Sequence, residues 1–122
     1  MSARRLIVAF AALAVVVGIG ASSVLAAKDQ TQKTTVKVTA LDTLKFTLSR
    51  KSAPHGVVSF VVTNKGRLKH DFWIAGKKTP LLGHNQTKTL TVTLSKGKKP
   101  YKCTVPGHAA AGMKGTFTIA PA

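Results

Sequence analysis

The sequence predicts an all-β domain, built as a two-sheet sandwich or a small barrel. Three observations support this fold class. From about Thr34 onward, apolar residues recur at every second position, which is the period of a strand with one buried face. Thr and Val are abundant, as in half-exposed strands. Gly, Pro and Asn separate the apolar runs, and helical periodicity is almost absent.

Seven segments carry the strand pattern, and they are expected to pair mostly antiparallel. They are Thr34–Ala40, Leu44–Arg50, Val57–Thr63, His70–Gly76, Thr87–Leu94, Tyr101–Cys103 and Gly115–Ala120. The first two each place three apolar side chains on one face. The third, VVSFVVT, is β-branched and nearly continuous, as expected of a central strand. The fourth follows the turn NKGR, and the fifth places Leu90, Val92 and Leu94 on one side. The sixth follows the turn SKGKKP, and the last has Phe117 and Ile119 facing inward.

The first 26 residues predict a secretory signal peptide. Two arginines precede the apolar run Leu6–Ala21, and small residues in an A-x-A-like pattern place cleavage after Ala26 or Ala27. The run has 16 residues, fewer than the roughly 20 that a spanning helix needs. An export signal is therefore preferred to the alternative, an uncleaved anchor. Residues 27–33 are then a short polar leader and residues 34–122 the domain, with a periplasmic or extracellular location.

The charge of the chain is strongly unbalanced. There are 19 Lys and Arg against three Asp and no Glu, and loss of the two signal arginines leaves 17 against three, a net charge of +14. Such a field attracts acidic partners, nucleic acids or anionic membrane surfaces. The lysines are dispersed and dense only in Ser95–Lys102, and seven aromatic residues are too few for base stacking. We therefore expect no nucleic-acid partner, whereas association with a membrane surface stays possible.

The segment CTVPGHAAAGM holds the single cysteine, Cys103, then His108, then the one internal methionine, Met113. A free thiol in an exported protein is prone to oxidation unless it is buried or coordinated. Pro and Gly in the segment indicate a loop, on which three side chains can converge. Thiolate, imidazole and thioether together suit copper, above all when Cu(I) and Cu(II) must both be held. The alternative is a buried Cys and a core Met, but Met113 lies between Gly112 and Lys114, with no strand face to fill.

A copper site with two His, one Cys and a long axial Met needs a second imidazole. His70 is the best candidate because it opens a predicted strand that a sandwich can place beside the loop. His55 and His84 lie in turns, and we expect them to be exposed and outside the site.

The stretch YKCTVPGHAAAGMKG resembles the copper-binding loop of the cupredoxins, the small blue copper proteins, and its spacing is most similar to auracyanin-like members. The stretch SFVVTNKGRLKHDFWIAG resembles the strand, turn and first His ligand of that family, and the resemblance covers about Thr34–Ala122. It implies a Greek-key β-sandwich with one type 1 copper ion. The implied ligands are His70, Cys103, His108 and, as the axial thioether, Met113.

One residue departs from the pattern of the family. Many members have Asn directly after the first His, and this chain has Asp71. A carboxylate there could still accept a hydrogen bond from the backbone or hydroxyl of Thr104, and its charge is expected to lower the reduction potential.

The resemblance implies a monomeric carrier of single electrons rather than an enzyme. The expected partners are acidic redox proteins, such as a c-type cytochrome or a copper-dependent reductase. Four protein ligands leave no open metal position for a substrate, and the chain has no Glu, no paired acids and no Ser/His/Asp set. Two rivals stay open. A copper chaperone or storage protein is disfavoured by the single internal Met, and a basic adhesin leaves the Cys/His/Met loop unexplained.

Small residues around His108 suggest where a partner docks. They are Pro106, Gly107, Ala109, Ala110 and Ala111. Such a collar would let a partner approach the imidazole edge closely, although the alanines could also serve only to form a tight turn. Leu81 and Leu82 are expected to extend the patch from the segment Gly76–Gly83, which lacks alternation and is predicted to be a loop.

Overall fold

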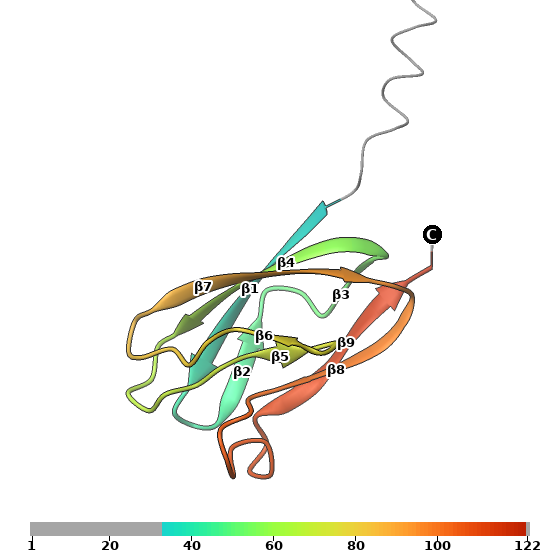
Figure 1. Ribbon diagram of the computed structural model, residues 1–122. Helices are drawn as coiled ribbons and strands as arrows, with labels where there is room; N and C mark the ends of the chain where they lie inside the picture. The colour runs from blue at the N-terminus through green and yellow to red at the C-terminus, as the bar shows by residue number, and fades with distance from the viewer. Residues whose placement is uncertain (1–32, 122) are drawn as a thin grey trace, which may run out of the picture. The chain divides into compact units, whose positions relative to one another are not determined.

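The computed structural model describes residues 33–121, and it folds them into two β-sheets that pack face to face (Figure 1). No helix occurs within this range. The strands are β1 (Lys33–Leu41), β2 (Lys45–Leu48), β3 (Ser52–Pro54), β4 (Gly56–Asn64), β5 (Trp73–Ile74), β6 (Lys77–Lys78), β7 (Thr87–Leu94), β8 (Gly97–Lys102) and β9 (Lys114–Ala120). The predicted all-β class is confirmed.

The two sheets have strand orders β2-β1-β4-β7 and β3-β9-β8-β5-β6. The pairs β1–β4 and β3–β9 are parallel, and the other five pairs are antiparallel. The chain passes repeatedly from one sheet to the other, which gives the Greek-key sandwich that the resemblance implied rather than a barrel. Strand β4 lies between β1 and β7, as expected of the nearly continuous apolar segment.

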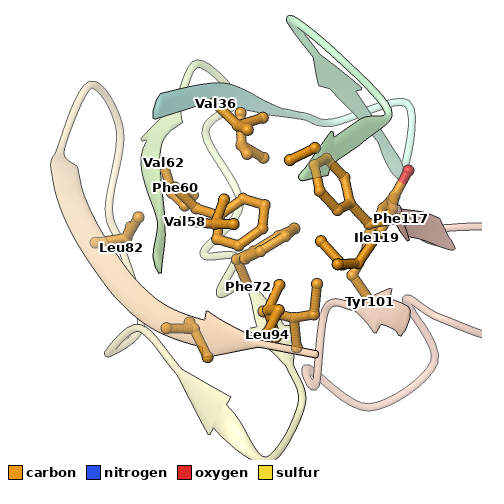
Figure 2. Close-up of a cluster of buried hydrophobic side chains, with 14 residues drawn as sticks. Val36, Val58, Phe60, Val62, Phe72, Leu82, Leu94, Tyr101, Phe117 and Ile119 are labelled. Carbon is orange, nitrogen blue, oxygen red and sulfur yellow. The ribbon is translucent and has the colours of Figure 1, made fainter. Parts of the chain in front are cut away.

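The core fills the space between the sheets (Figure 2). The buried positions on the predicted inward faces are Val36, Val38, Ala40, Val92, Leu94, Phe117 and Ile119. At the centre, the ring of Phe60 lies 5.2 Å from that of Phe72 and 5.3 Å from that of Phe117, measured between centroids. A smaller cluster of Ala40, Cys103 and Met113 lies at one end. The alternation of the sequence therefore predicted which faces are buried.

The predicted strand His70–Gly76 is shorter than expected, since only β5 is regular. His70 instead forms an isolated antiparallel bridge with Leu82. The amide of Phe72 donates to Thr79 Oγ1 at 3.1 Å, and the amide of Thr79 donates to the carbonyl of Phe72 at 3.0 Å. The backbone before β5 therefore pairs with the segment before β7, and this draws His70 away from a regular sheet.

The predicted loop Gly76–Gly83 contains a short strand, β6, that the sequence did not reveal. Ala75 and Gly76 have positive φ angles of 51° and 78°. Two such residues form the tight turn that suits a two-residue hairpin, and β6 folds back on β5. Two strand residues are too few to show a period.

Two other boundaries also differ from the prediction. Strand β8 starts at Gly97, so most of the predicted turn SKGKKP is strand, with Pro100 opposite Thr116. Cys103 lies one residue beyond the end of β8 instead of inside a strand. The polar segment before His55 forms β3, which runs parallel to β9. Its three residues carry no alternation that could have been recognised.

Residues 1–32 lie outside the described residues. The signal peptide, its cleavage and most of the leader therefore stay predictions, whereas Lys33 of the predicted leader begins β1. No helix within residues 33–121 has the length and apolarity that crossing a bilayer requires.

The central aromatic cluster yields a stability prediction. Phe60→Ala should lower the free energy of unfolding by about 3–5 kcal/mol, because it leaves a cavity between two rings. Urea unfolding measures this loss as a lower midpoint concentration, with the dependence of the unfolding free energy on urea concentration (the m-value) unchanged. Thr93→Ala, at an exposed position on β7, is the control and should change stability by less than about 0.5 kcal/mol. Equal effects of the two changes would contradict this account of the core.

Candidate metal centre

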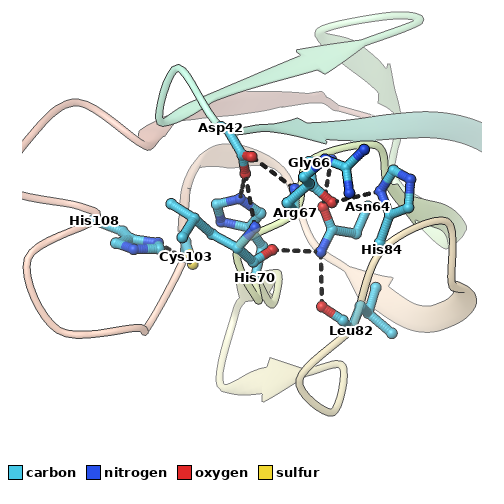
Figure 3. A network of polar contacts seen from close by, with 10 residues as sticks. Asp42, Asn64, Gly66, Arg67, His70, Leu82, His84, Cys103 and His108 are labelled. Atoms are coloured by element: carbon cyan, nitrogen blue, oxygen red, sulfur yellow. Dashed lines mark hydrogen bonds and ion pairs between the residues drawn. The ribbon is translucent and has the colours of Figure 1, made fainter.

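Three predicted ligands meet at one end of the sandwich. Single donor atoms of His70, Cys103 and His108 all lie within 4.8 Å of one another. Cys103 Sγ is 3.6 Å from His108 Nδ1, and the two imidazole centroids are 5.0 Å apart. Figure 3 shows Cys103 near the rings of both histidines. His70 comes from the segment between β4 and β5, and the other two come from the β8–β9 loop.

The backbone of the β8–β9 loop fixes the spacing of its ligands. The amide of Cys103 donates to the carbonyl of Met113 at 3.1 Å, and the amide of Met113 donates to the carbonyl of His108 at 3.0 Å. Gly107 and Gly112 have φ angles of 85° and 118°, which residues with a Cβ rarely adopt. The loop therefore closes on itself and brings the ends of CTVPGHAAAGM together, as the Pro and Gly positions predicted.

Met113 is fully buried in the small cluster beside Cys103, with Leu44 and Val105 packed against it. Met113 has no strand face to fill, as expected, because it precedes β9, but it does fill this small apolar cluster. Its hydrogen bonds to the backbones of Cys103 and His108 keep it next to the other ligands. Its role as the axial thioether stays a prediction.

His70 is fully buried, and its two ring nitrogens have different surroundings. Nε2 lies 3.1 Å from Asp42 Oδ1, whereas Nδ1 has no hydrogen-bond partner. Because an ionised carboxylate only accepts hydrogen bonds, Nε2 donates to Asp42, and in the neutral imidazole the lone pair is then on Nδ1. A buried acceptor without a partner is costly. A metal ion at Nδ1 would satisfy it, so the donor set fits copper.

Asp42 is the residue of this site that the sequence analysis missed. Besides His70, its carboxylate accepts hydrogen bonds from the amides of Arg67 at 2.6 Å and Leu68 at 3.1 Å. A Cβ on Gly66 would lie 2.0 Å from Asp42 Oδ1, so only glycine leaves room for this contact. The Arg67 amide, helped by His70 and the Leu68 amide, holds the pKa of Asp42 below its usual value. The carboxylate therefore stays charged beside the ligand.

Asn64, at the end of β4, holds the segment that carries His70. Its side chain is fully buried and donates to the carbonyls of Leu68 at 2.8 Å and Leu82 at 2.7 Å. Its Oδ1 accepts the amide of Gly66 at 2.8 Å. The bridge between His70 and Leu82 adds backbone hydrogen bonds of 2.8 and 3.3 Å. These contacts, several of which are drawn in Figure 3, fix the ring of His70 before any metal binds.

Asp71 links the two segments that provide ligands. Its Oδ1 accepts the amide of Thr104 at 2.6 Å, and its Oδ2 accepts the Thr104 hydroxyl. This contact confirms the expectation that a carboxylate can replace the usual Asn here. Because Asp71 follows His70 and Thr104 follows Cys103, the pair keeps these two ligands side by side.

Cys103 is buried as a thiol, and its surroundings control its ionisation. Burial raises the pKa of Cys103, and the negative charge of Asp71 adds to this effect. Backbone hydrogen bonds from Asp71 and Val105 act in the opposite direction and favour the thiolate. The metal-free thiol is therefore protonated at neutral pH, and a bound cation supplies the charge that stabilises the thiolate.

His55 and His84 are exposed and lie outside this donor group. His84 Nδ1 donates to the carbonyl of Gly66 at 2.8 Å, so it supports the loop around Asp42. His55 lies between β3 and β4. Of these histidines, the structure places only His70 beside Cys103 and His108.

The comparisons with known proteins identify the family of the chain. A family model for copper binding proteins of the plastocyanin/azurin family matches residues 21–120, so the chain belongs to that family. Copper is accordingly its cofactor, and His70, Cys103 and His108 are the described residues that can form a type 1 copper site.

Three individual relatives are between 19% and 30% identical to this chain. The copper-resistant cuproprotein CopI of Vibrio cholerae is 30% identical over 102 residues, in a match that covers 64% of this chain and 60% of that protein. The dithionite-reduced auracyanin of Roseiflexus castenholzii is 23% identical, with a TM-score of 0.64 over 75% of this chain and all of the other. Auracyanin A, a blue copper protein from Chloroflexus aurantiacus, is 19% identical, with a TM-score of 0.61 over 73% of this chain and all of the other. The two auracyanins show the shared fold.

The choice of His70 as first ligand yields a spectroscopic prediction. His70→Gln should abolish the intense visible absorption that appears on Cu(II) addition, because the buried imidazole donor is lost. His84→Gln should leave the band in place, since His84 contacts only the backbone of the loop. Cys103→Ser is the colourless reference. Loss of the band in His84→Gln but not in His70→Gln would mean that the first ligand is wrong.

The Asp42 contact yields a second prediction for this site. Asp42→Asn should raise the reduction potential. The negative charge of Asp42 stabilises Cu(II) more than Cu(I), and the substitution removes that charge. It should also weaken Cu(II) binding by about 10–100-fold, as is usual when a partner of a ligating His is changed. Voltammetry and chelator competition measure the two effects. Thr93→Lys, an equal charge change at an exposed position on β7, is the control, and similar shifts in both variants would refute a local role of Asp42.

Proposed function

We propose that this protein is an exported electron carrier rather than an enzyme. The observation that carries the proposal is the convergence of His70, Cys103 and His108, together with the buried Nδ1 of His70, which has no hydrogen-bond partner and could bind a metal ion. When bound, copper supplies a one-electron change between Cu(II) and Cu(I). With Met113 as a fourth donor, no position would stay open for a substrate.

The residues around the donors hold them in one arrangement. Asp42 and the Leu82 bridge orient His70, and the Asp71–Thr104 contact keeps Cys103 beside it. A preorganised set of ligands needs little rearrangement when the charge of the metal changes. This rigidity supports electron transfer more directly than transfer of the metal ion itself.

Among the three donors, only His108 is accessible from the surface. His70 and Cys103 are at most 1% exposed, whereas His108 is half-buried. Neighbouring Ala110 and Ala111 are exposed and small. An electron partner is therefore expected to approach the edge of the His108 ring, where the path to the metal is shortest.

The predicted apolar patch needs one correction. Leu82 is buried, because its backbone pairs with His70 and its side chain joins the core. It therefore contributes nothing to the surface. Leu81 is 55% exposed, as expected, and Leu68 is 50% exposed although the sequence analysis did not single it out. Both lie within two residues of the His70–Leu82 bridge.

The charge of the protein favours acidic redox partners, such as a c-type cytochrome. The predicted mature chain carries +14, and such a field accelerates encounter with a negatively charged protein. The predicted signal peptide supports a location in the periplasm or outside the cell. We expect a monomer, because the exposed apolar surface around His108 is then free to bind a redox partner.

A second candidate is a role in copper tolerance, which the 30% identity to the copper-resistant cuproprotein CopI favours. This chain spans 60% of the length of that protein. A storage or delivery protein would pass its copper to an apo-acceptor, whereas an electron carrier keeps its copper through many redox cycles. Measuring copper loss to an apo-acceptor during repeated oxidation and reduction separates the two roles.

The proposed carrier role is tested by stopped-flow electron transfer to an acidic c-type cytochrome over a salt series. The rate should fall steeply with salt, because the Debye length shrinks from about 30 Å at 0.01 M to about 8 Å at 0.15 M ionic strength. Ala110→Glu should slow transfer within the complex. Lys45→Gln should mainly slow encounter, because Lys45 Nζ would lie 2.9 Å from a Cβ on Gly112 and so borders the copper loop.

Lys96→Gln, in the turn before β8 and at the opposite end of that strand from Cys103, is the matched control. It should change the rate less than Lys45→Gln does. Electron-transfer rates that do not depend on salt, or that are the same in Ala110→Glu as in the unchanged protein, would mean that electrons leave by another face.

A further inference from the structure

We propose that a groove on the outer face of the second sheet binds a small planar organic anion, such as an aromatic carboxylate. This Trp73 groove is lined by Trp73 of β5, Pro100 to Lys102 of β8 and Lys114 to Thr116 of β9. Its volume is about 560 Å³, within the range of about 300–1,000 Å³ that is typical of small-molecule sites. None of the lining residues is a copper donor, although Lys102 directly precedes Cys103 and Lys114 directly follows Met113. The proposal does not depend on the electron-carrier role.

The strand register explains how the groove arises. Lys78 is paired with Trp73, Trp73 with Lys102, and Lys102 with Lys114, so one row of side chains crosses β6, β5, β8 and β9. Directly opposed residues share a face of the sheet. The three lysines are exposed, whereas the neighbouring residue Ile74 is buried in the core. The row therefore lies on the outer face.

The groove combines an aromatic wall with positive charge. Trp73 is half-buried, and Lys102 Nζ lies 5.2 Å from the centroid of its ring. This cation–π contact holds an ammonium group beside an apolar surface. Pro100 and Thr116 form the next opposed pair in the same groove. A planar ring can pack against Trp73 and Pro100 while its carboxylate lies near the ammonium groups.

The lysines of the groove have no acidic partner in the described part of the chain. The two acids within residues 33–121 are Asp42 and Asp71, and both are hydrogen-bonded around the copper ligands. Within this range, neither carboxylate forms a salt bridge with a Lys or Arg side chain. An anion in the groove would therefore meet positive charge that no side chain of the described domain neutralises, and this favours an anionic ligand over a neutral one.

The sole tryptophan of the chain provides a direct readout of the groove. Trp73 emission is followed in the full-length, copper-loaded and reduced protein during titration with benzoate at low salt, and calorimetry measures the same affinity. Benzamide has the ring without the charge, and acetate has the charge without the ring. Benzoate should bind saturably, and both comparison compounds should bind about ten-fold more weakly.

Variants test whether binding uses these particular lysines. Lys102→Gln and Lys114→Gln should each weaken benzoate binding several-fold. Lys96→Gln makes the same charge change in the turn between β7 and β8, away from the groove, and should leave binding unchanged. Trp73→Leu, measured by calorimetry, should weaken binding because the aromatic wall is lost.

Four results would overturn the proposal. Equal binding of acetate would show general attraction to a basic protein, and equal binding of benzamide would show that the charge is not used. An equal effect of Lys96→Gln would place the anion elsewhere. Binding of a hexaglutamate peptide without binding of benzoate would make the face a docking surface for acidic proteins instead.

Discussion

The hydrogen bond between Asp42 and His70 is the contact on which the metal site depends. It places the proton of a fully buried imidazole on Nε2 and leaves Nδ1 free beside Cys103 and His108. The surrounding structure serves this contact. Gly66 leaves space for the carboxylate, and Asn64 fixes the turn that supplies its amide donors. The site is therefore built from the end of β4 as much as from the loop that carries Cys103.

The few acidic residues of the described domain have a common use. Asp42 supports one copper ligand, and Asp71 joins the segments of two ligands through Thr104. Neither is available to neutralise the lysines of the surface. The described carboxylates are thus placed where they orient metal donors, and the surface lysines keep no acidic partner among them.

Alternation predicted the long strands because each has enough residues to show a buried face, as in Val36, Val38 and Ala40 of β1. It failed for β3 and β6, which have three and two residues and depend on their partners. The spacing of Cys103, His108 and Met113 predicted the loop, because a few neighbouring residues define it. Asp42 was not predictable in this way, since 28 residues separate it from His70 and only the folded turn brings them together.

The burial of Cys103 also determines how long the metal-free protein survives. A protonated thiol that is 1% exposed reacts slowly with oxidants and with other thiols, because the reactive species is an accessible thiolate. We therefore expect the thiol of a newly folded, metal-free chain to stay reduced under oxidising conditions, without forming disulfide-linked dimers, until copper binds.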